Sequence, residues 1–328
     1  LSGDHSGMRV GKAKYSLVLT EDGGIVDDVI VYRTAEDRYL VIANAGNRDA
    51  VAEALALRAA RAPVAASFLA PRVRTGGTTF FLFVPGVSDT AQIEDVTDHL
   101  ALVAVQGPAA RAILEATPEI GEVTPALIEL GYYAWAAGSF DGEPLFIART
   151  GYTGEDGFEL LVPHRAAGAL WDALLAAGTP LGLVPAGLAA RDTLRLEAGM
   201  PLYGHELSLE TAPAQAGLAR SVADGKPDFV GKRALQSSDA DSRVLVGLVS
   251  EGRRAGRAGY TVVDPSADGA PAVGEVTSGA LSPTLGHPIA LAYVDPTVSA
   301  PGTELAIDVR GTLIPASVTT LPFYRRTT

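Results

Sequence analysis

The feature that most limits the possible folds is a change in the pattern of apolar and turn residues near residue 240. Before it, segments with strand-like alternation are interleaved with segments whose apolar residues recur at helical spacing. From RVLVGLVSEG onward, short apolar runs are separated by Gly, Pro and Asp at intervals of about 8 to 12 residues. This second pattern is typical of a small β-barrel or sandwich. We therefore predict an α+β region over residues 1–239 and a small β-barrel or sandwich domain over residues 240–328.

Strands and helices alternate in the first region. YSLVLTEDGGIVDDVIVYR predicts two strands joined by a turn at residues 22–24, and RYLVIANAG predicts a third strand. Residues 97–116 predict a strand, a turn at QGP and a helix, and residues 143–163 predict two strands joined by a glycine-rich turn. Further helices are predicted over residues 48–62, 164–177 and 185–199, the last ending at Gly199.

Composition excludes several classes of protein. The 328 residues are 47% hydrophobic and 20% charged, as expected for a globular chain of more than one domain. The net charge of -12 argues against a nucleic-acid binder that works by bulk attraction. No apolar run reaches the roughly 18 to 20 residues that would span a bilayer, and no signal peptide is visible, so we expect no membrane association.

The cysteine and histidine content argues against disulfides and against several kinds of metal and nucleophile site. The absence of cysteine excludes disulfides, thiolate metal sites and thiol nucleophiles. The five histidines lack an i, i+4 pair and an HExxH motif, so no metal site is predicted. GxGxxG after a first strand, GxxxxGK[ST] and GxSxG are also missing, which disfavours Rossmann, P-loop and α/β-hydrolase folds.

Two adjacent carboxylates, Asp27 and Asp28, lie within the β-branched run GIVDDVIVY. Successive side chains on a strand point to opposite faces, so one of the two is expected to face inward. The alternative is a half-exposed strand that carries its acids on a wet face and at a fraying end. The pattern alone leaves both explanations open.

Two further stretches could carry chemistry. In GYTGEDGFEL, a core-facing Phe158 would turn Glu159 to the opposite face, toward a cleft or toward solvent. In AGLAARDTLRLEAG, Arg191 and Arg195 are four residues apart and share a helical face, which is either solvated or grips a ligand carboxylate. Basic clusters around Arg149, around Arg191 and at the C-terminal PFYRR suit a small anionic ligand.

Taken together, these stretches resemble one family. The chain is similar to the aminomethyltransferases of the glycine cleavage system, the T-proteins, and to the wider folate-binding family. The match rests on segments in the family's order: KAKYSLVLTEDGGIVDDVIVYR, IANAGN, DVTDHLALVAVQGPAA, ARTGYTGEDGFEL, PAGLAARDTLRLEAGMPLYGHEL, DFVGKRAL and GEVTSGALSPTLGHPIALAYV.

The resemblance implies a fold, an activity and partners. The fold would be three domains around a central folate channel, the first two interwoven and the last a β-barrel. The activity would be that of a tetrahydrofolate-dependent aminomethyltransferase of glycine catabolism and one-carbon metabolism. It would take an aminomethyl group from the lipoylated H-protein, release ammonia and form 5,10-methylenetetrahydrofolate. No nucleic acid or membrane would take part, and we expect a cytoplasmic bacterial protein.

The resemblance also implies roles for individual residues. Asp28 matches the family's essential aspartate, which orients the reacting nitrogen N5 of the folate, and Asp27 would be the outward, structural member of the pair. Glu159 matches the acid that pairs with N–H groups of the pterin ring.

Other matching positions would line the folate site. They are Tyr15 and Tyr152 beside the pterin, Asn44 as its support, Arg191 near the folate, and Tyr324 with Arg325 at the glutamate or benzoyl end. Arg326 could serve in place of Arg325.

Two departures from the family are expected to matter. The family has several dozen residues before the segment that aligns with LSGDHSG, so we expect the first domain to lack part of its core. Residues 63–90, with their apolar FFLFV, have no clear counterpart and form either an extra hairpin or an inserted loop. FFLFV would then complete the first domain or mark an oligomer contact.

Alternative functions within the same fold are a folate-dependent demethylase or methyltransferase and a folate-binding module without catalysis. A flavin dehydrogenase is disfavoured because the dinucleotide fingerprint is missing. The iron-sulfur helper of this fold is disfavoured because DFVGKRAL stands where that protein has its cysteine.

Overall fold

The structure is a computed structural model that describes residues 1–61, 68–69, 79–85, 91–237 and 242–326. The chain forms two compact units. The first unit comprises Leu1–Val18, Val26–Gly151 and Glu155–Pro185, and the second comprises Leu19–Ile25, Tyr152–Gly154 and Ala186–Thr328. The domain boundary predicted between residues 239 and 240 falls on residues outside the described ones, and it stays a prediction.

A six-stranded sheet forms one half of the first unit, with the strand order β1-β2-β3-β5-β6-β4. The strands are β1 (Ala13–Leu19), β2 (Ile25–Ala35), β3 (Arg38–Ala43), β4 (Phe68–Leu69), β5 (Thr79–Pro85) and β6 (Ala91–Asp95). Strand β5 pairs with β3 and with β6, so the predicted apolar run is part of the sheet, as the extra-hairpin alternative requires. The rest of that segment, 62–67, 70–78 and 86–90, lies outside the described residues.

A five-stranded sheet with the order β7-β11-β10-β9-β8 forms the other half. Its strands are β7 (Leu100–Gln106), β8 (Ile120–Thr124), β9 (Trp135–Phe140), β10 (Glu143–Ala148) and β11 (Gly157–Pro163). Strands β10 and β11 pair antiparallel across the glycine-rich turn, as the sequence predicts. The helices of this unit are η1 (Ala45–Asn47), α1 (Arg48–Arg61), η2 (Thr97–His99), α2 (Ala110–Ala116), η3 (His164–Ala166), α3 (Ala167–Gly178) and η4 (Thr179–Leu181).

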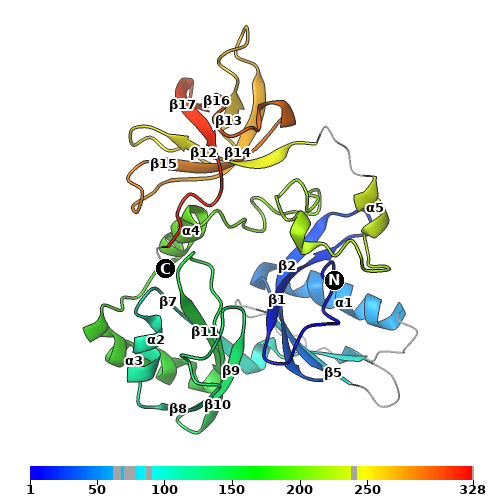
Figure 1. Cartoon of the computed structure of the whole chain (residues 1–328), viewed down its shortest axis with the longest axis vertical. Coiled ribbons are helices and arrows are strands. Elements are labelled where there is room, and N and C mark those ends of the chain that lie inside the picture. The colour runs from blue at the N-terminus through cyan, green and yellow to red at the C-terminus, as the bar shows by residue number, and fades with distance from the viewer. Residues whose placement is uncertain (62–67, 70–78, 86–90, 238–241, 327–328) are drawn as a thin grey trace. The chain divides into compact units, whose positions relative to one another are not determined.

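The two sheets of the first unit face each other, and helices cover their outer faces (Figure 1). Val51 and Leu55 of α1 pack with Val29 and Val31 of β2 on one side of the six-stranded sheet. Helices α2 and α3 pack on the outer side of the five-stranded sheet. Between the sheets, Tyr32 of β2 contacts Phe146 of β10 edge to face, with ring centroids 5.3 Å apart. Around β2 and β10, therefore, both faces of the sheets are covered.

The second unit contains a closed barrel with the strand order β12-β15-β14-β13-β16-β17, which is one of the two forms that the turn-rich pattern allows and the one that the family resemblance implies. The barrel strands are β12 (Val244–Ser250), β13 (Thr261–Val263), β14 (Ala272–Leu281), β15 (Pro288–Val294), β16 (Glu304–Val309) and β17 (Thr312–Thr319). The helices of the second unit are α4 (Leu188–Glu197), η5 (Ala219–Ser221), α5 (Lys232–Gln236) and η6 (Pro296–Val298). Helix α4 ends before Gly199, whose φ of +65° is the left-handed conformation expected at such a stop.

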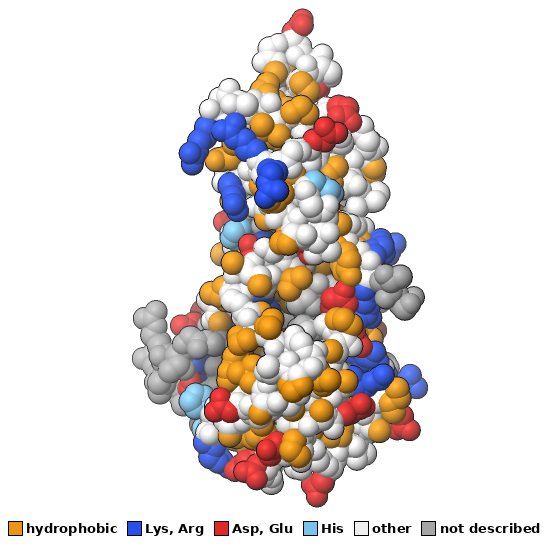
Figure 2. Space-filling model, turned by 90° about the vertical axis from the view of Figure 1, so that its left-hand side faces the viewer, with side chains coloured by type: hydrophobic (Ala, Val, Ile, Leu, Met, Phe, Trp, Pro, Cys, Tyr) orange, Lys and Arg blue, Asp and Glu red, His pale blue; other side chains and the backbone are white. Residues whose placement is uncertain are grey.

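Surface charge is unevenly distributed over the second unit. Arg253, Arg254 and Arg257 are exposed in the segment between β12 and β13. Figure 2 shows basic side chains gathered on one side of the barrel, while acidic and hydrophobic side chains are interspersed over the remainder of that face. None of the helices in the described ranges is long and apolar enough to cross a membrane.

Candidate functional site

The adjacent acids of β2 lie on opposite faces of the six-stranded sheet. Asp27 is in register with Val29 and Val31 on the side that α1 covers, and Asp28 is in register with Tyr32 on the side of the second sheet. Asp27 is 0% exposed, whereas Asp28 is partly exposed. The prediction that Asp27 faces outward is therefore wrong, because both faces of this sheet are covered.

Two side chains hold the Asp28 carboxylate. The Tyr15 hydroxyl donates to Oδ2 at 3.1 Å, and the Asn44 side-chain amide donates to Oδ1 at 2.8 Å. The register that pairs Ile30 with Ile42 continues to bring Asn44, just beyond β3, opposite Asp28. Burial raises the pKa of Asp28 above its usual range, and the hydrogen bonds from Tyr15 and Asn44 oppose that shift.

Asp27 has its own set of donors. Its carboxylate accepts hydrogen bonds from the backbone N–H of Asn44 at 2.9 Å and from the side-chain amides of Asn44 and Asn47 at 2.8 and 2.7 Å. Burial raises the pKa of Asp27 to about 6, since it outweighs these donors. Two carboxylates and one bridging amide thus form a polar cluster at this end of the sheet.

Glu159 lies on the face of the five-stranded sheet that looks toward β2. Phe158 and Leu160 belong to the core under α2 and α3, as the alternation predicts, and Leu161 belongs to the layer between the sheets. The Thr150 hydroxyl donates to Glu159 Oε2. Because that hydroxyl has a single proton, the Tyr32 hydroxyl, 2.9 Å away, donates to Thr150.

Asp28 and Glu159 both contribute to a raised pKa of Tyr133. Its pKa is raised to about 12, first by burial and then by the neighbouring Tyr132, Glu159 and Asp28. Asp28 and Glu159, both in the first unit, therefore act electrostatically on the same Tyr133 hydroxyl. The structure brings Tyr15, Asp28 and Asn44 into one hydrogen-bonded cluster, with Glu159 facing the same layer.

The remaining predicted residues belong to the second unit. The Arg191 guanidinium carbon lies 4.9 Å from the centroid of the Tyr152 ring, a cation–π contact. The Tyr152 hydroxyl donates to the backbone carbonyl of Pro201. Near the C-terminus, the Tyr324 backbone N–H donates to the Glu197 carbonyl at 2.8 Å, and Arg325 is exposed.

Two of the predicted anion-binding arginines are occupied by protein groups. Arg149 makes a bidentate pair with Asp156, at 2.9 and 2.7 Å, and also donates to the Leu130 carbonyl. Arg195 does not resemble Arg191, because it is 1% exposed and pairs with Glu206. The prediction that both arginines of α4 serve one solvated or ligand-binding face is wrong for Arg195.

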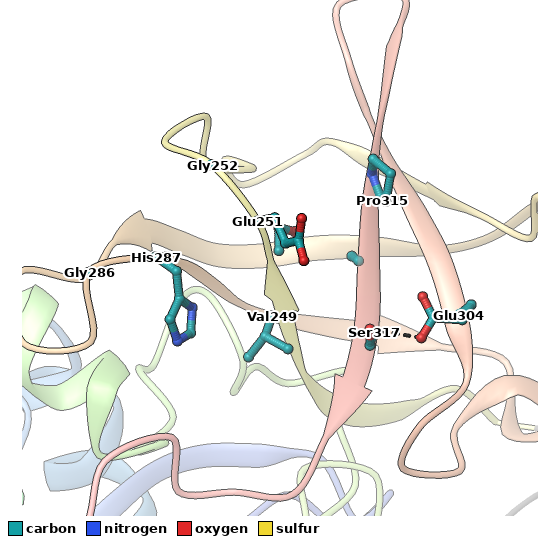
Figure 3. A pocket seen from close by; sticks show the side chains of 10 residues that line it. Val249, Glu251, Gly252, Gly286, His287, Glu304, Pro315 and Ser317 are labelled. Carbon is teal, nitrogen blue, oxygen red and sulfur yellow. Dashed lines mark hydrogen bonds between the residues drawn. The ribbon is translucent and has the colours of Figure 1, made fainter.

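A pocket of about 640 Å³ opens on the barrel (Figure 3). It is lined by Glu251 just after β12, by Glu304 of β16 and Ser317 of β17, and by His287 just before β15. The Ser317 hydroxyl donates a hydrogen bond to Glu304 with a donor–acceptor distance of 3.0 Å, and Figure 3 marks this bond with a dashed line. None of the predicted site residues lines this pocket. In the described part of the chain, no group of three or more acidic or histidine side chains could hold a metal ion.

Three polar residues around the acids escaped prediction. Asn47 stands in the quoted segment IANAGN, and its spacing from Asn44 by three residues was the available signal. Tyr32 and Thr150 are 118 residues apart in the chain and meet only in the folded unit. No local pattern in the sequence marks that contact.

Two family models together match most of the chain. Residues 1–226 match the GCVT N-terminal domain, and residues 243–325 match the glycine cleavage T-protein C-terminal barrel domain. An aminomethyltransferase from Cutibacterium acnes is 47% identical over 331 residues, which cover 99% of this chain and 81% of that protein. One from Streptomyces avermitilis is 49% identical, with coverage of 99% and 80%.

A solved structure agrees with these relatives. The glycine cleavage system aminomethyltransferase T from Bartonella henselae matches with a TM-score of 0.80 and 34% identity, covering 99% of this chain and 79% of that one. The fold, a mixed α/β region followed by a closed barrel, is the one that the resemblance implied. The chain therefore belongs to the glycine cleavage T-protein family of aminomethyltransferases.

Proposed function

We propose that this aminomethyltransferase moves the methylene carbon of an aminomethyl group from the lipoyl arm of the H-protein to tetrahydrofolate, forming 5,10-methylenetetrahydrofolate. The carbon loses its bonds to nitrogen and sulfur and gains bonds to N5 and N10 of the folate. The two protons from N5 and N10 end on the released ammonia and on the lipoyl thiol, so atoms and charge balance.

The observation that carries the proposal is the Asp28 carboxylate, partly exposed on the inner face of β2 and held by Tyr15 and Asn44. A fixed carboxylate can accept an N–H and stabilise the positive charge that develops as an amine reacts. Its orientation is set before the ligand binds, because one oxygen is bonded to each donor. We assign Asp28 the role of orienting the reacting nitrogen.

The carboxylate acceptors of the site suit a reduced pterin. That ring system presents several N–H groups, and carboxylate oxygens are suitable acceptors for them. Glu159 faces the layer between the sheets and is oriented by Thr150 and Tyr32, so we assign it to the pterin N–H groups. Tetrahydrofolate, when bound, supplies the nitrogen atoms that accept the one-carbon unit.

Tyr152 and Arg191 stay proposed folate contacts. Tyr152 and Arg191 offer a ring and a guanidinium that are already stacked on each other, which suits an aromatic ligand that ends in carboxylates. We keep Tyr324 and Arg325 as contacts for the benzoyl or glutamate end. The lipoylated H-protein is the proposed protein partner.

The relatives are named for aminomethyl transfer, so a demethylase and a binding module without catalysis are not favoured. The direct test incubates the protein with tetrahydrofolate and aminomethylated H-protein and follows ammonia release. We expect release by the wild type and a loss of about hundredfold or more in kcat for Asp28→Asn. Wild-type protein that binds folate yet releases no ammonia would contradict the proposed transfer.

A further inference from the structure

Asp27 is a buried charge that the proposed chemistry leaves without a task. It is 0% exposed and lies on the α1 side of β2, in register with the apolar Val29 and Val31. Burying a carboxylate in such a position is costly, and an apolar residue would satisfy the alternation of the strand. The presence of an acid there calls for a specific reason.

The donors to Asp27 all come from one short segment, the turn between β3 and α1. Asn44 contributes its backbone N–H at 2.9 Å and its side-chain amide at 2.8 Å, and Asn47 contributes its side-chain amide at 2.7 Å. Asp27 therefore fixes both the backbone and the side chain of Asn44.

Asn44 is also the link to Asp28. Its side-chain nitrogen lies 2.8 Å from Oδ1 of Asp27 and 2.8 Å from Oδ1 of Asp28. An amide nitrogen has two hydrogens, so each carboxylate receives one. A rotated amide would point its oxygen at two carboxylates, and this repulsion holds Asn44 in a single orientation.

We propose that Asp27 is a positioning residue for the transfer: by fixing Asn44, it sets the orientation of the Asp28 carboxylate. This inference rests on the proposed function of Asp28. The two acids, neighbours on one strand but on opposite faces, act together only because Asn44 reaches both of them. Asp28, on one face of β2, then orients the reacting nitrogen, and Asp27, on the other face, holds Asn44 in the position that orients Asp28.

A purely structural role would give different results. Asp27 accepts a backbone N–H at the start of η1 and α1, so it also resembles a cap of that helical segment. A cap alone stabilises the fold and leaves the catalytic step of the folded enzyme unchanged. Two measurements distinguish the positioning role from the capping role: the kcat of the folded variant and the pH titration of the Asp28 carboxylate.

The test compares Asp27→Asn with Asp95→Asn in the full chain. Asp95 is also a buried acid of the first unit, 6% exposed, and it accepts hydrogen bonds from Arg48 and from the Thr97 backbone. We expect Asp27→Asn to lower kcat by about tenfold to hundredfold while KM for tetrahydrofolate changes by less than about threefold. Asp95→Asn should lower the melting temperature and keep the wild-type kcat.

A second readout needs no activity. With ¹³C-labelled aspartate and no folate or H-protein, the carboxyl resonance of Asp28, assigned with Asp28→Asn, is followed through a pH titration. Because Asp27→Asn also removes a neighbouring charge that acts on Asp28 directly, the deciding variant is Asn47→Ala, which keeps that charge: it should change the Asp28 chemical shift and midpoint, and Asp95→Asn should leave both as in the wild type. This measurement decides the inference even if the wild type releases no ammonia, in which case only the proposed function fails.

A milder variant covers the case in which Asp27→Asn does not fold. Asn47→Ala removes one donor to Asp27 from a partly exposed position and leaves Asn44 and Asp28 intact. We expect a smaller drop in kcat, about threefold, together with a changed Asp28 resonance. A wild-type kcat and a wild-type Asp28 titration in the folded variants would overturn the inference.

Discussion

Arg195 and Glu206 form an ion pair inside the second unit, with 2.9 Å between Nη1 and Oε2 and exposed fractions of 1% and 0%. The same guanidinium donates to Ser278 of β14 at 2.7 Å and to Asp192 at 2.8 Å. Arg195 thus ties α4 to the barrel and to the segment after α4. Burying this pair removes two charges from water, so a substitution that deletes one partner leaves the other as an unpaired buried charge and strongly destabilises the fold.

We expect Arg195→Met to lower the free energy of unfolding by about 3 to 5 kcal/mol, because Glu206 would be left as an uncompensated buried charge. No donor among the described residues reaches Glu206 Oε1, so the carboxylate depends heavily on this arginine. Chemical denaturation of the full chain measures the effect.

The control for this prediction is Arg243→Ala. Arg243 and Asp295 belong to the same unit and also lie 2.9 Å apart, but they are 45% and 41% exposed. Solvent screening should limit the cost of losing this pair to under about 1 kcal/mol. Equal costs for the two variants would show that burial does not determine the strength of the Arg195 pair.

Asp27 should make stability depend on pH. Its pKa is about 6 in the folded chain, above the ordinary 3.8 of the unfolded chain, so the folded state binds the proton more tightly. Its contribution is therefore fully present below pH 3.8 and is lost as pH rises through 6. The loss amounts to about 3 kcal/mol for a shift of this size.

Urea denaturation of wild type and Asp27→Asn at several pH values measures this contribution, since other titrating groups cancel in the difference. We expect the stability advantage of the wild type to shrink between about pH 4 and pH 6 and to level off above about pH 7. A difference that does not change with pH would contradict the raised pKa of Asp27.

Thr150→Val should weaken folate binding by about tenfold, because it removes the hydroxyl that donates a hydrogen bond to Glu159 and accepts one from Tyr32. Tetrahydrofolate affinity, measured by titration calorimetry, reports the effect. Thr117→Val is the matched control, because Thr117 is also 1% exposed but donates to the Ile113 carbonyl. Equal folate affinity in both variants would remove Thr150 from the site.

Gly24 should not tolerate a side chain. A Cβ at this position would lie 1.7 Å from the Leu209 carbonyl oxygen, which belongs to the backbone and cannot move aside cheaply. We expect Gly24→Ala to cost about 3 kcal/mol or more. Gly225→Ala, with nothing within 4 Å of its Cβ, should stay within about 0.5 kcal/mol of the wild type. Thermal unfolding of both variants provides the comparison.

Local sequence rules predicted much of the fold. Helix α1 covers Arg48–Arg61 against a prediction of residues 48–62, and the turn at residues 22–24 joins neighbouring strands. The face of Glu159 followed from Phe158 by simple alternation. These features depend on neighbours within a few residues, where side-chain period and turn chemistry act directly.

The position of Asp27 shows where local rules fail. Alternation correctly separated the faces of Asp27 and Asp28, but the outer face of β2 was expected to meet solvent, and α1 covers it. The partners of Arg195 were equally hidden, since Glu206 and Ser278 follow it by 11 and 83 residues. The division near residue 240 and the roles of the site residues stay predictions.

The sequence by itself determined many of the elements, an all-β C-terminal domain and the family, because periodicity, turn residues and long matching segments depend only on the order of residues in the chain. The tertiary structure decided which polar groups meet: Asn44 bridging two acids, Thr150 linking Tyr32 to Glu159, and Arg195 paired with Glu206. The physical reason is that burial and hydrogen bonding depend on what packs against each face, and those partners come from distant parts of the chain.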